Sequence, residues 1–248
     1  MQQSWQRAVI IGASSGIGEA LARKLASEGC LVAMVARRLE KLEQIAEEIA
    51  ASGAPKPLLY RHDVCEVECV PALFQQITYE LGGLDLIIYS AGIMPILAEH
   101  EYSLEKDLAT IDVNVRGAVA WLDVAAERFE RAGSGTLIGI SSVAGDRGRR
   151  HFPVYSASKA FLDTYLEGLR NRTGRYGVRV VTIKPGPVDT PLVKGLKNLP
   201  FLISADKAAE LILKGARRDG VVYVPRIWRP IMAIVRLIPS FIFKRLNV

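Results

Sequence analysis

The sequence predicts an α/β fold in which a parallel sheet is covered by helices on both faces. Short apolar runs alternate with helical patterns along the chain, and this rhythm places the strands together in one parallel sheet. Half of the 248 residues are apolar and 23% are charged, which indicates a globular chain with a substantial core. No linker or internal repeat interrupts the pattern. Residues 1–224 are therefore expected to form one domain, with residues 225–248 as a C-terminal extension.

Each expected strand is a short run rich in apolar and β-branched residues. In chain order the strands are Ala8–Ile11, Leu31–Ala36, Leu58–Val64, Leu84–Ser90, Thr136–Ile140, Arg179–Lys184 and Val221–Val224. Helical spacing follows the first strand, covers Val67–Leu81 and Asp206–Ala216, and occurs in two stretches within Leu104–Phe129. Residues Lys194–Leu202 are expected to be irregular.

The first strand runs directly into a glycine-rich turn, Gly12-Ala13-Ser14-Ser15-Gly16-Ile17-Gly18, and then into a helix. A strand, a glycine turn and a helix in this order can hold a phosphate, because the helix N-terminus faces the anion. Gly12 would make the tight turn, Gly16 would admit a pyrophosphate, and Gly18 would let the helix pack closely. The turn lacks the Lys-Ser/Thr pair of an ATP-binding loop, and a plain Gly/Ser turn is the alternative interpretation.

The second expected strand ends at Ala36, near the place where an acidic residue would bind an unmodified adenosine ribose. Arg37 and Arg38 follow instead, and the donor fork of a guanidinium suits a 2′-phosphate. The sequence therefore favours NADP(H). In the alternative, both arginines begin an exposed helix and pair with its glutamates, which are Glu40, Glu43, Glu47 and Glu48.

The stretch from Ser142 to Lys159 carries the residues expected to perform chemistry. Tyr155 and Lys159 are four residues apart in a helical pattern of small residues, so their side chains share one helix face. A cation beside a phenol favours the phenolate, so the pKa of Tyr155 is expected to be lowered. Ser142 closes the strand Thr136–Ile140, and its hydroxyl can face the same polar group. The three residues predict a proton-transfer site, although an isolated Tyr-x-x-x-Lys pair most often lies on the surface of a helix without a catalytic role.

In this order, the motifs resemble those of the short-chain dehydrogenase/reductase family from Ala8 to about Val224. The matching motifs are Gly12-x3-Gly16-Ile17-Gly18, Asp63-Val64, Asn114, Ser142, Tyr155-x3-Lys159 and Pro185-Gly186-x-Val188-x-Thr190. The resemblance implies a Rossmann-like, doubly wound fold of about seven parallel strands and an NAD(P)-dependent oxidoreductase. Two departures are Ile11, where threonine is frequent, and Ser90, where asparagine is usual; at Ser90 we expect a local rearrangement that leaves cofactor binding intact.

The resemblance also implies roles for individual residues. Asn114, Ser142, Tyr155 and Lys159 would form the catalytic group. The cofactor would be bound by Gly12, Ser14, Ser15, Gly16, Ile17, Gly18, Arg37, Arg38, Asp63, Val64, Ala91, Gly92, Tyr155, Lys159, Pro185, Gly186, Val188 and Thr190. Members of the family often form dimers or tetramers, so a homo-oligomer is expected.

These roles predict a carbonyl reductase that acts on a hydrophobic substrate. Tyr155 would protonate the carbonyl oxygen, Ser142 would donate a hydrogen bond to it, and Lys159 would acidify Tyr155 and hold the nicotinamide ribose. Asn114 would position a water molecule, but an interior amide can equally be structural. The alternative function is a catalytically silent, NADPH-binding regulatory protein of the same fold.

The net charge of +6 is concentrated in the extension, where residues 225–248 hold five basic residues and no acid. A general nucleic-acid surface is therefore not expected. Ile231, Ile234, Val235 and Ile238 fall on one helical face, which predicts a subunit interface, a pocket cover or a peripheral membrane contact. The arginines of residues 146–151 could favour an anionic substrate, but a solvated loop is the preferred interpretation.

Cysteine usage and the N-terminal sequence concern the cellular compartment. The three cysteines, Cys30, Cys65 and Cys69, cannot all pair, and no secretory signal is visible, so a reducing, cytoplasmic location is expected; a peripheral location at a membrane surface is the alternative. His62, Cys65 and Cys69 form an H-x2-C-x3-C cluster, but a structural zinc site usually adds a second close pair of ligands. No metal is therefore expected.

Overall fold

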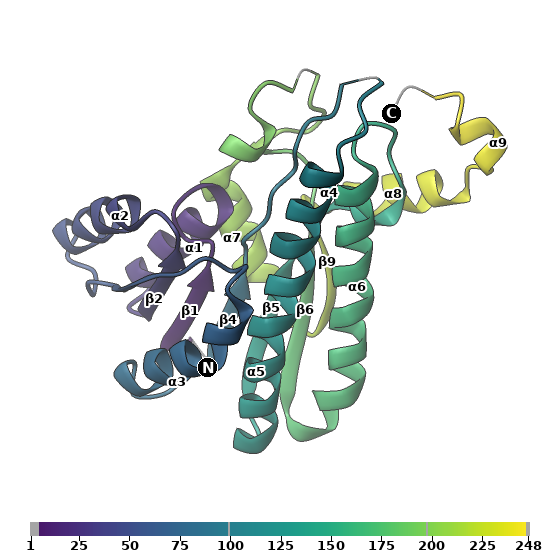
Figure 1. Ribbon diagram of the computed structural model, residues 1–248. Helices are drawn as coiled ribbons and strands as arrows, with labels where there is room; N and C mark the ends of the chain where they lie inside the picture. Colours follow the sequence, from purple (N-terminus) through teal and green to yellow (C-terminus); the bar gives the residue numbers. More distant parts are fainter. Residues whose placement is uncertain (1–4, 99, 197, 247–248) are drawn as a thin grey trace.

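The computed structural model describes residues 5–98, 100–196 and 198–246, and its centre is a seven-stranded sheet (Figure 1). The strand order is β3-β2-β1-β4-β5-β6-β9, and every neighbouring pair is parallel. The strands are β1 Arg7–Ile11, β2 Leu31–Ala36, β3 Leu58–Arg61, β4 Leu86–Tyr89, β5 Gly135–Ile140, β6 Val178–Pro185 and β9 Gly220–Val224. The predicted doubly wound α/β fold is confirmed.

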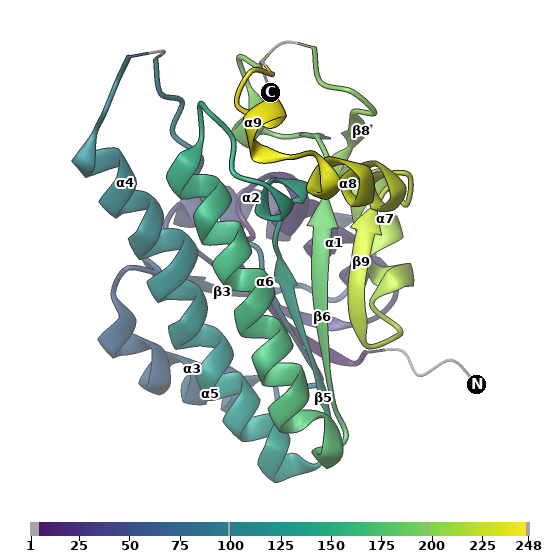
Figure 2. The same ribbon diagram turned by 90° about the vertical axis from the view of Figure 1, so that its right-hand side faces the viewer.

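Helices cover both faces of this sheet (Figures 1 and 2). One face carries α1 Gly16–Ser27, α2 Leu39–Ala51 and α7 Ala205–Gly215, and the other carries α3 Val70–Glu80, α5 Gly117–Ala132 and α6 Pro153–Thr173. Alternate residues of each strand serve the two layers. Ala8 and Ile10 of β1 pack on the α1 side, and Val9 and Ile11 pack on the α5 side. Burial on both faces explains why the strands are almost uniformly apolar.

The sheet order reverses between β1 and β4, and this reversal positions the site. The chain leaves β1 toward β2 and β3 and then crosses back to β4, so the loops after β1 and β4 diverge at the carboxyl ends of the strands. A crevice opens at such a switch point in open α/β sheets. The backbone N–H of Ser90 donates to the carbonyl oxygen of Ile11 at 2.8 Å, so the β1–β4 ladder runs unbroken to this edge. The rearrangement expected at Ser90 is therefore not seen in the backbone.

One expected strand is shorter in the structure. The third strand ends at Arg61 instead of Val64, which leaves His62, Asp63 and Val64 in the loop beyond the sheet edge.

The two helical stretches expected within Leu104–Phe129 are confirmed. They are α4 Leu104–Ile111 and α5, and a π-helical turn at Asp112–Arg116 joins them. Such π turns often occur at functional sites, and this one contains Asn114.

The C-terminal extension folds back over the sheet edge. Helices α8 Trp228–Leu237 and α9 Ser240–Phe243 lie across the carboxyl ends of β6 and β9 (Figure 2). Trp228 and Met232 are buried against Val143, while Ile234 is 67% exposed on the opposite side of α8. Ile234 therefore does not belong to the covering face that the sequence pattern predicted. Among the described residues, no helix is both long enough and apolar enough to span a bilayer.

Candidate active site

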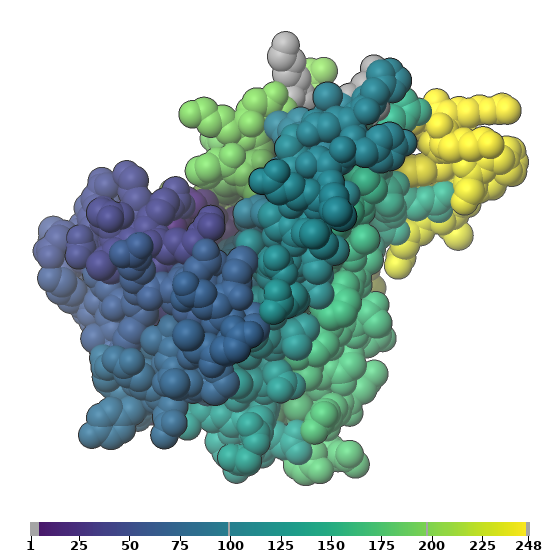
Figure 3. Space-filling model, in the orientation of Figure 1, coloured from purple at the N-terminus to yellow at the C-terminus, as the bar shows by residue number. Residues whose placement is uncertain are grey.

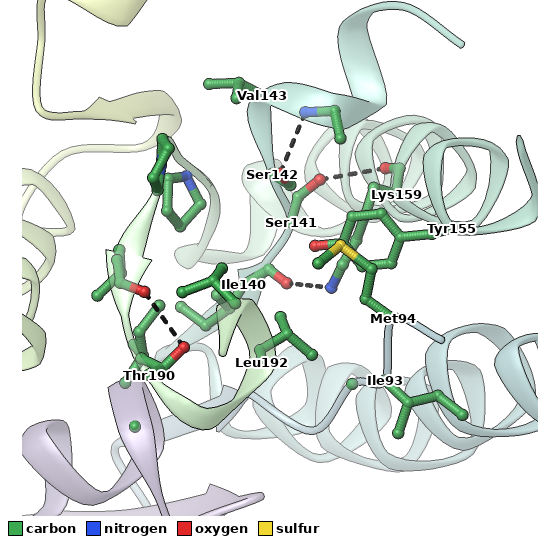
Figure 4. A pocket seen from close by; sticks show the side chains of 18 of the residues that line it. Ile93, Met94, Ile140, Ser141, Ser142, Val143, Tyr155, Lys159, Thr190 and Leu192 are labelled. Carbon is green, nitrogen blue, oxygen red and sulfur yellow. Dashed lines mark hydrogen bonds between the residues drawn. The ribbon is translucent and has the colours of Figure 1, made fainter. Parts of the chain in front are cut away.

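A cavity of about 1210 Å³ opens at the carboxyl ends of the strands. The glycine turn after β1 lies at one end, and Ser142, Tyr155 and Lys159 lie in the wall further along (Figure 4). Helix α8 contributes Trp228 and Met232 to the same cavity. This volume exceeds the roughly 300–1,000 Å³ of a typical single-ligand pocket, so there is room for a dinucleotide and a second molecule.

The glycine turn has a shape that side chains would block. Gly12 has φ +89° and Gly16 has φ +59°, a backbone region that favours glycine. A Cβ on Gly12 would lie 2.5 Å from the backbone nitrogen of Ala91, and one on Gly16 would lie 2.9 Å from a methyl carbon of Thr190. A Cβ on Gly18 would overlap the carbonyl oxygen of Gly12, so Gly18 lets α1 pack against the turn. Because α1 begins at Gly16, its unpaired N–H groups face the cavity and fit a pyrophosphate.

Arg38 closes this end of the cavity. Its Nη2 donates to the hydroxyls of Ser14 at 2.9 Å and Ser15 at 2.8 Å. Arg37 instead forms an ion pair with Asp63 at 3.5 Å. In the described structure neither arginine pairs with a glutamate of α2, which was the alternative predicted from the sequence. Arg38, Ser14 and Ser15 thus form a polar cluster that could hold a phosphate group.

Asp63 and Val64 were both expected to flank the adenine, and of these two residues only Val64 lines the cavity. The Asp63 carboxylate accepts a hydrogen bond from the backbone N–H of Cys65 at 3.0 Å. Burial alone would raise the pKa of Asp63, but this bond and Arg37 together lower it. Asp63 therefore stays ionised and anchors Arg37.

Ser142 and Tyr155 face one another across the wall of the cavity. The Ser142 hydroxyl accepts a hydrogen bond from the backbone N–H of Ala144 at 3.1 Å, so its own proton is free to be donated. Tyr155 is 8% exposed. Burial raises the pKa of Tyr155, while a hydrogen bond from Ser142 and the charge of Arg149 act to lower it. The expected lowering of this pKa is not found, because burial dominates.

Lys159 lies one helical turn after Tyr155 and is also buried. Its Nζ donates to the carbonyl oxygen of Ile140 at 2.9 Å and lies 5.7 Å from the centroid of the Tyr155 ring (Figure 4). Burial lowers the pKa of Lys159 to about 8. The tip of β5 therefore fixes the ammonium, and Lys159 is not among the groups that set the pKa of Tyr155.

Asn114 ties the cofactor side of the cavity to α6. Its Oδ1 accepts from the backbone N–H of Ile93 at 2.9 Å, and its Nδ2 donates to the Ile93 carbonyl and to the Ser158 hydroxyl, both at 3.0 Å. Ser158 in turn donates to the carbonyl oxygen of Tyr155 at 2.8 Å. This amide braces the structure, as the structural interpretation expects.

The remaining predicted cofactor residues line the cavity from two loops. Ala91 and Gly92 follow β4, and the end of β6 with the segment after it contributes a second set: Pro185, Gly186, Val188 and Thr190. A Cβ on Gly186 would overlap the indole of Trp228, so this glycine lets the C-terminal extension close over the loop. Gly186 thus has a packing reason that the sequence pattern did not reveal.

A buried ion cluster supports the site from behind. Lys184, at the end of β6, forms ion pairs with Asp146 at 2.6 Å and with Asp163 of α6 at 2.7 Å. The Tyr223 hydroxyl donates to Asp146 at 2.9 Å. The cluster joins β6, β9 and α6 to the 3-10 turn Val143–Asp146, which follows Ser142. Sequence analysis did not find it, because its members are far apart in the chain.

Arg149 is a second residue that sequence analysis did not assign to the site. It is half-buried and lines the cavity on the Tyr155 side, so the interpretation of residues 146–151 as a solvated loop is wrong for this residue. The described residues include no group of three or more His, Cys, Asp or Glu side chains arranged to hold a metal ion.

Comparisons with known proteins point to one family. The family described as short chain dehydrogenase matches residues 6–199. The chain is 37% identical over 228 residues to an uncharacterized oxidoreductase of Myxococcus xanthus, a match that covers 90% of this chain and 89% of that protein. A solved short-chain type dehydrogenase/reductase from Mycobacterium marinum is 30% identical with a TM-score of 0.80, over 88% of this chain and 94% of that one. The structure of ElxO with NADP bound has a TM-score of 0.81 over 89% of this chain and 97% of that one; at 20% identity this likeness shows the fold alone.

Proposed function

The chain belongs to the short chain dehydrogenase family, whose members are oxidoreductases of CH–OH and C=O groups, and on that premise we propose that it is an NADP(H)-dependent carbonyl reductase. One observation carries the proposal. A hydroxyl, a phenol and an ammonium from Ser142, Tyr155 and Lys159 line a single cavity that continues to a glycine turn shaped for a pyrophosphate.

The preference for NADP(H) is supported by Arg38. Its guanidinium is held beside the glycine turn by Ser14 and Ser15, where the adenosine ribose of a bound dinucleotide would lie. The same three side chains offer a cation and two hydroxyls to a 2′-phosphate. When bound, NADPH supplies the hydride that reduces the carbonyl carbon.

The side chains of the protein supply the proton and stabilise the developing charge. Burial keeps Tyr155 protonated at neutral pH, so the phenol can give its proton to the carbonyl oxygen. Ser142 would donate a hydrogen bond to the same oxygen as negative charge develops there. Lys159 would hold the nicotinamide ribose and return a proton to Tyr155, because its pKa of about 8 suits proton exchange near neutral pH.

A hydrophobic substrate is supported by the far wall of the cavity. Trp228, Met232 and Val235 of α8 line it together with Leu199 and Phe201, and Phe201 packs edge-on against Trp228 with ring centroids 5.8 Å apart. Such a wall favours apolar substrate groups over water.

The proposal extends to the partners of the chain. Leu104 and Leu108 of α4 are 74% and 50% exposed, and we assign this helix to a homodimer or homotetramer contact. Light scattering of the purified protein would test this, since a monomer at all concentrations contradicts it. We assign the exposed side of the C-terminal extension, with Ile234, Leu237 and Phe241, to a peripheral membrane contact.

The test of the proposed reaction is a cofactor-consumption screen. Ketosteroids, fatty acyl ketones, quinones and small aldehydes would each be offered with NADPH and with NADH. Tyr155→Phe should lower turnover by at least about 100-fold while NADPH affinity stays close to that of the wild type. Full activity of Tyr155→Phe would remove Tyr155 from the mechanism. NADPH binding without turnover of any carbonyl compound would favour the catalytically silent regulatory protein instead.

A further inference from the structure

The loop between the 3-10 turn Val143–Asp146 and α6 carries three arginines, and two of them are occupied by the C-terminal extension. Arg147 donates to the carbonyl oxygen of Arg236 at 3.1 Å and lies over the ring of Phe243, 4.5 Å from its centroid. Arg150 donates to the carbonyl oxygen of Lys244 at 3.4 Å. These contacts hold the loop against the extension.

The third arginine of the loop, Arg149, points to the cavity and not to the C-terminal extension. Its side chain enters the cavity wall on the Tyr155 side, and among the described residues its guanidinium has neither a hydrogen bond nor an ion pair. Burial lowers its pKa, and its charge is close enough to Tyr155 to act on the phenol. An arginine that loses water without gaining an acceptor is unfavourable, because each donor is left unsatisfied.

The charge of the cavity wall has a single sign. The ionisable side chains that line it are basic or phenolic, and no aspartate or glutamate is found among the described lining residues. Arg37 and Arg38 lie at the glycine-turn end, where they are paired with Asp63, Ser14 and Ser15. Arg149 therefore offers positive charge at the substrate end, separate from the phosphate-binding end.

We infer that Arg149 binds a carboxylate of the substrate, so that the preferred substrate is an oxo acid with an apolar chain; this inference rests on the proposed carbonyl reduction. The guanidinium fork matches a carboxylate with two parallel hydrogen bonds. A singly charged carboxylate is matched by one arginine, whereas a phosphate dianion would call for a second cation, and Arg147 is already held by Phe243 and Arg236.

The position of Arg149 sets how the substrate lies. Arg149 and Tyr155 line the same cavity and the charge of Arg149 acts on the phenol, so the carboxylate would lie on the same side of the cavity as the carbonyl whose oxygen Tyr155 must reach. The remaining chain can then extend along Trp228, Met232 and Val235. The substrate class is an aliphatic or aromatic oxo acid whose two oxygen functions are close together.

A binding experiment tests the anion site without catalysis. Octanoate and octanamide would be titrated calorimetrically into the full-length protein saturated with NADP⁺. We expect octanoate to bind at least about tenfold more tightly than octanamide, because only the carboxylate pairs with Arg149. Arg149→Gln should remove this difference and Arg149→Lys should keep part of it. Arg172→Gln changes an exposed arginine near the C-terminal end of α6, which does not line the cavity, and serves as the matched control that keeps the whole difference.

A kinetic experiment tests the substrate class. Reduction of 4-oxononanoate and of its methyl ester by NADPH would be compared, and kcat/KM for the acid should exceed that for the ester by about tenfold or more. Arg149→Gln should bring this ratio close to one, whereas Arg172→Gln should leave it unchanged.

The outcomes separate this inference from the proposed function. Equal use of acid and ester by the wild type, with equal binding of octanoate and octanamide, overturns the role of Arg149 and leaves carbonyl reduction standing. Arg149-dependent binding of octanoate without reduction of any oxo compound overturns the proposed function but supports the anion site. Should Arg149→Gln fail to fold, Arg149→Lys and the wild-type acid-to-ester ratio still decide.

Discussion

Lys159 donates from its Nζ to the carbonyl oxygen of Ile140 at 2.9 Å, which holds the ammonium at the tip of β5. Burial lowers the pKa of this lysine from 10.5 to about 8, and burial raises the pKa of Tyr155. At neutral pH the phenol therefore keeps its proton, as an acid in carbonyl reduction must. Burial removes water from the Lys159 ammonium, and its hydrogen bond to Ile140 compensates for only part of that loss.

The unfavourable burial of the Lys159 ammonium predicts that the stability of the protein depends on pH. Because the folded pKa of Lys159 lies below the unfolded value, the folded state loses its proton first, and stability rises with pH between about 8 and 10.5. Below that window the charged lysine costs up to about 3 kcal/mol. Lys159→Met should therefore gain stability relative to the wild type at neutral pH, and this gain should disappear above pH of about 10.5.

Urea unfolding at several pH values would measure the effect. Lys41→Met, which removes an exposed lysine of α2, is the control whose stability difference should not change with pH. A stability difference between Lys159→Met and the wild type that is constant from neutral to alkaline pH would contradict the cost assigned to burying the Lys159 ammonium.

Arg38 predicts the cofactor preference. Arg38→Leu should raise the KM for NADPH by about 10- to 100-fold, because a charge-assisted hydrogen bond contributes about 1.5–3 kcal/mol, and it should change the KM for NADH little. Arg37→Leu is the matched control, since Arg37 is paired with Asp63 at 3.5 Å, and its effect on NADPH should be smaller. Steady-state kinetics with both cofactors would check this, and equal losses for NADPH and NADH would remove Arg38 from phosphate recognition.

The two buried ion pairs of Lys184 predict that replacing this lysine will cause a large loss of stability. Lys184→Met would leave the buried carboxylates of Asp146 and Asp163 without their cation, and breaking a buried ion pair in this way typically costs about 3–5 kcal/mol. Lys207→Met removes a lysine from an exposed pair with Glu210 and should change stability by less than about 1 kcal/mol. Urea unfolding of both variants would measure the difference, and a Lys184→Met protein as stable as the wild type would show that the cluster contributes little.

The sequence predicted those features that depend on local pattern. The seven strands and the helices between them follow from apolar runs and helical spacing. The turn at Gly12 and Gly16 was also readable, because the backbone conformation there favours glycine. The pairing of Tyr155 with Lys159 on one helix face followed from their spacing of four residues.

Features that depend on long-range packing were not predictable in this way. The interpretation of residues 146–151 as a solvated loop was wrong at Arg149, because Arg147 and Arg150 bind this loop to the carbonyl oxygens of Arg236 and Lys244. These partners lie 89 and 94 positions further along the chain. The lowered pKa expected for Tyr155 was argued from a cation four residues away on the same helix face. In the structure Tyr155 is buried, and desolvation raises its pKa by more than Ser142 and Arg149 lower it.

The outer side of the C-terminal extension predicts binding to an anionic membrane surface. Ile234, Leu237 and Phe241 are 67%, 82% and 62% exposed, while the inner side of the same segment covers the cavity. This segment projects from one side of the molecule (Figure 3). Its five basic residues are exposed, and the segment contains no acid; they are Arg226, Arg229, Arg236, Lys244 and Arg245. Apolar side chains beside cations favour an anionic interface over a neutral one.

Vesicle co-sedimentation would measure this contact. The full-length protein should bind phosphatidylserine-containing vesicles more strongly than pure phosphatidylcholine vesicles, and added salt should weaken binding because the attraction is partly electrostatic. The double variant Leu237→Glu and Phe241→Glu should lose most of it. Tyr79→Glu, which places the same charge on an 86% exposed aromatic of α3, should not. If the double variant instead changes the oligomeric state and leaves vesicle binding unaltered, the exposed side chains belong to a subunit contact, because only a protein partner would then account for their exposure in the single chain.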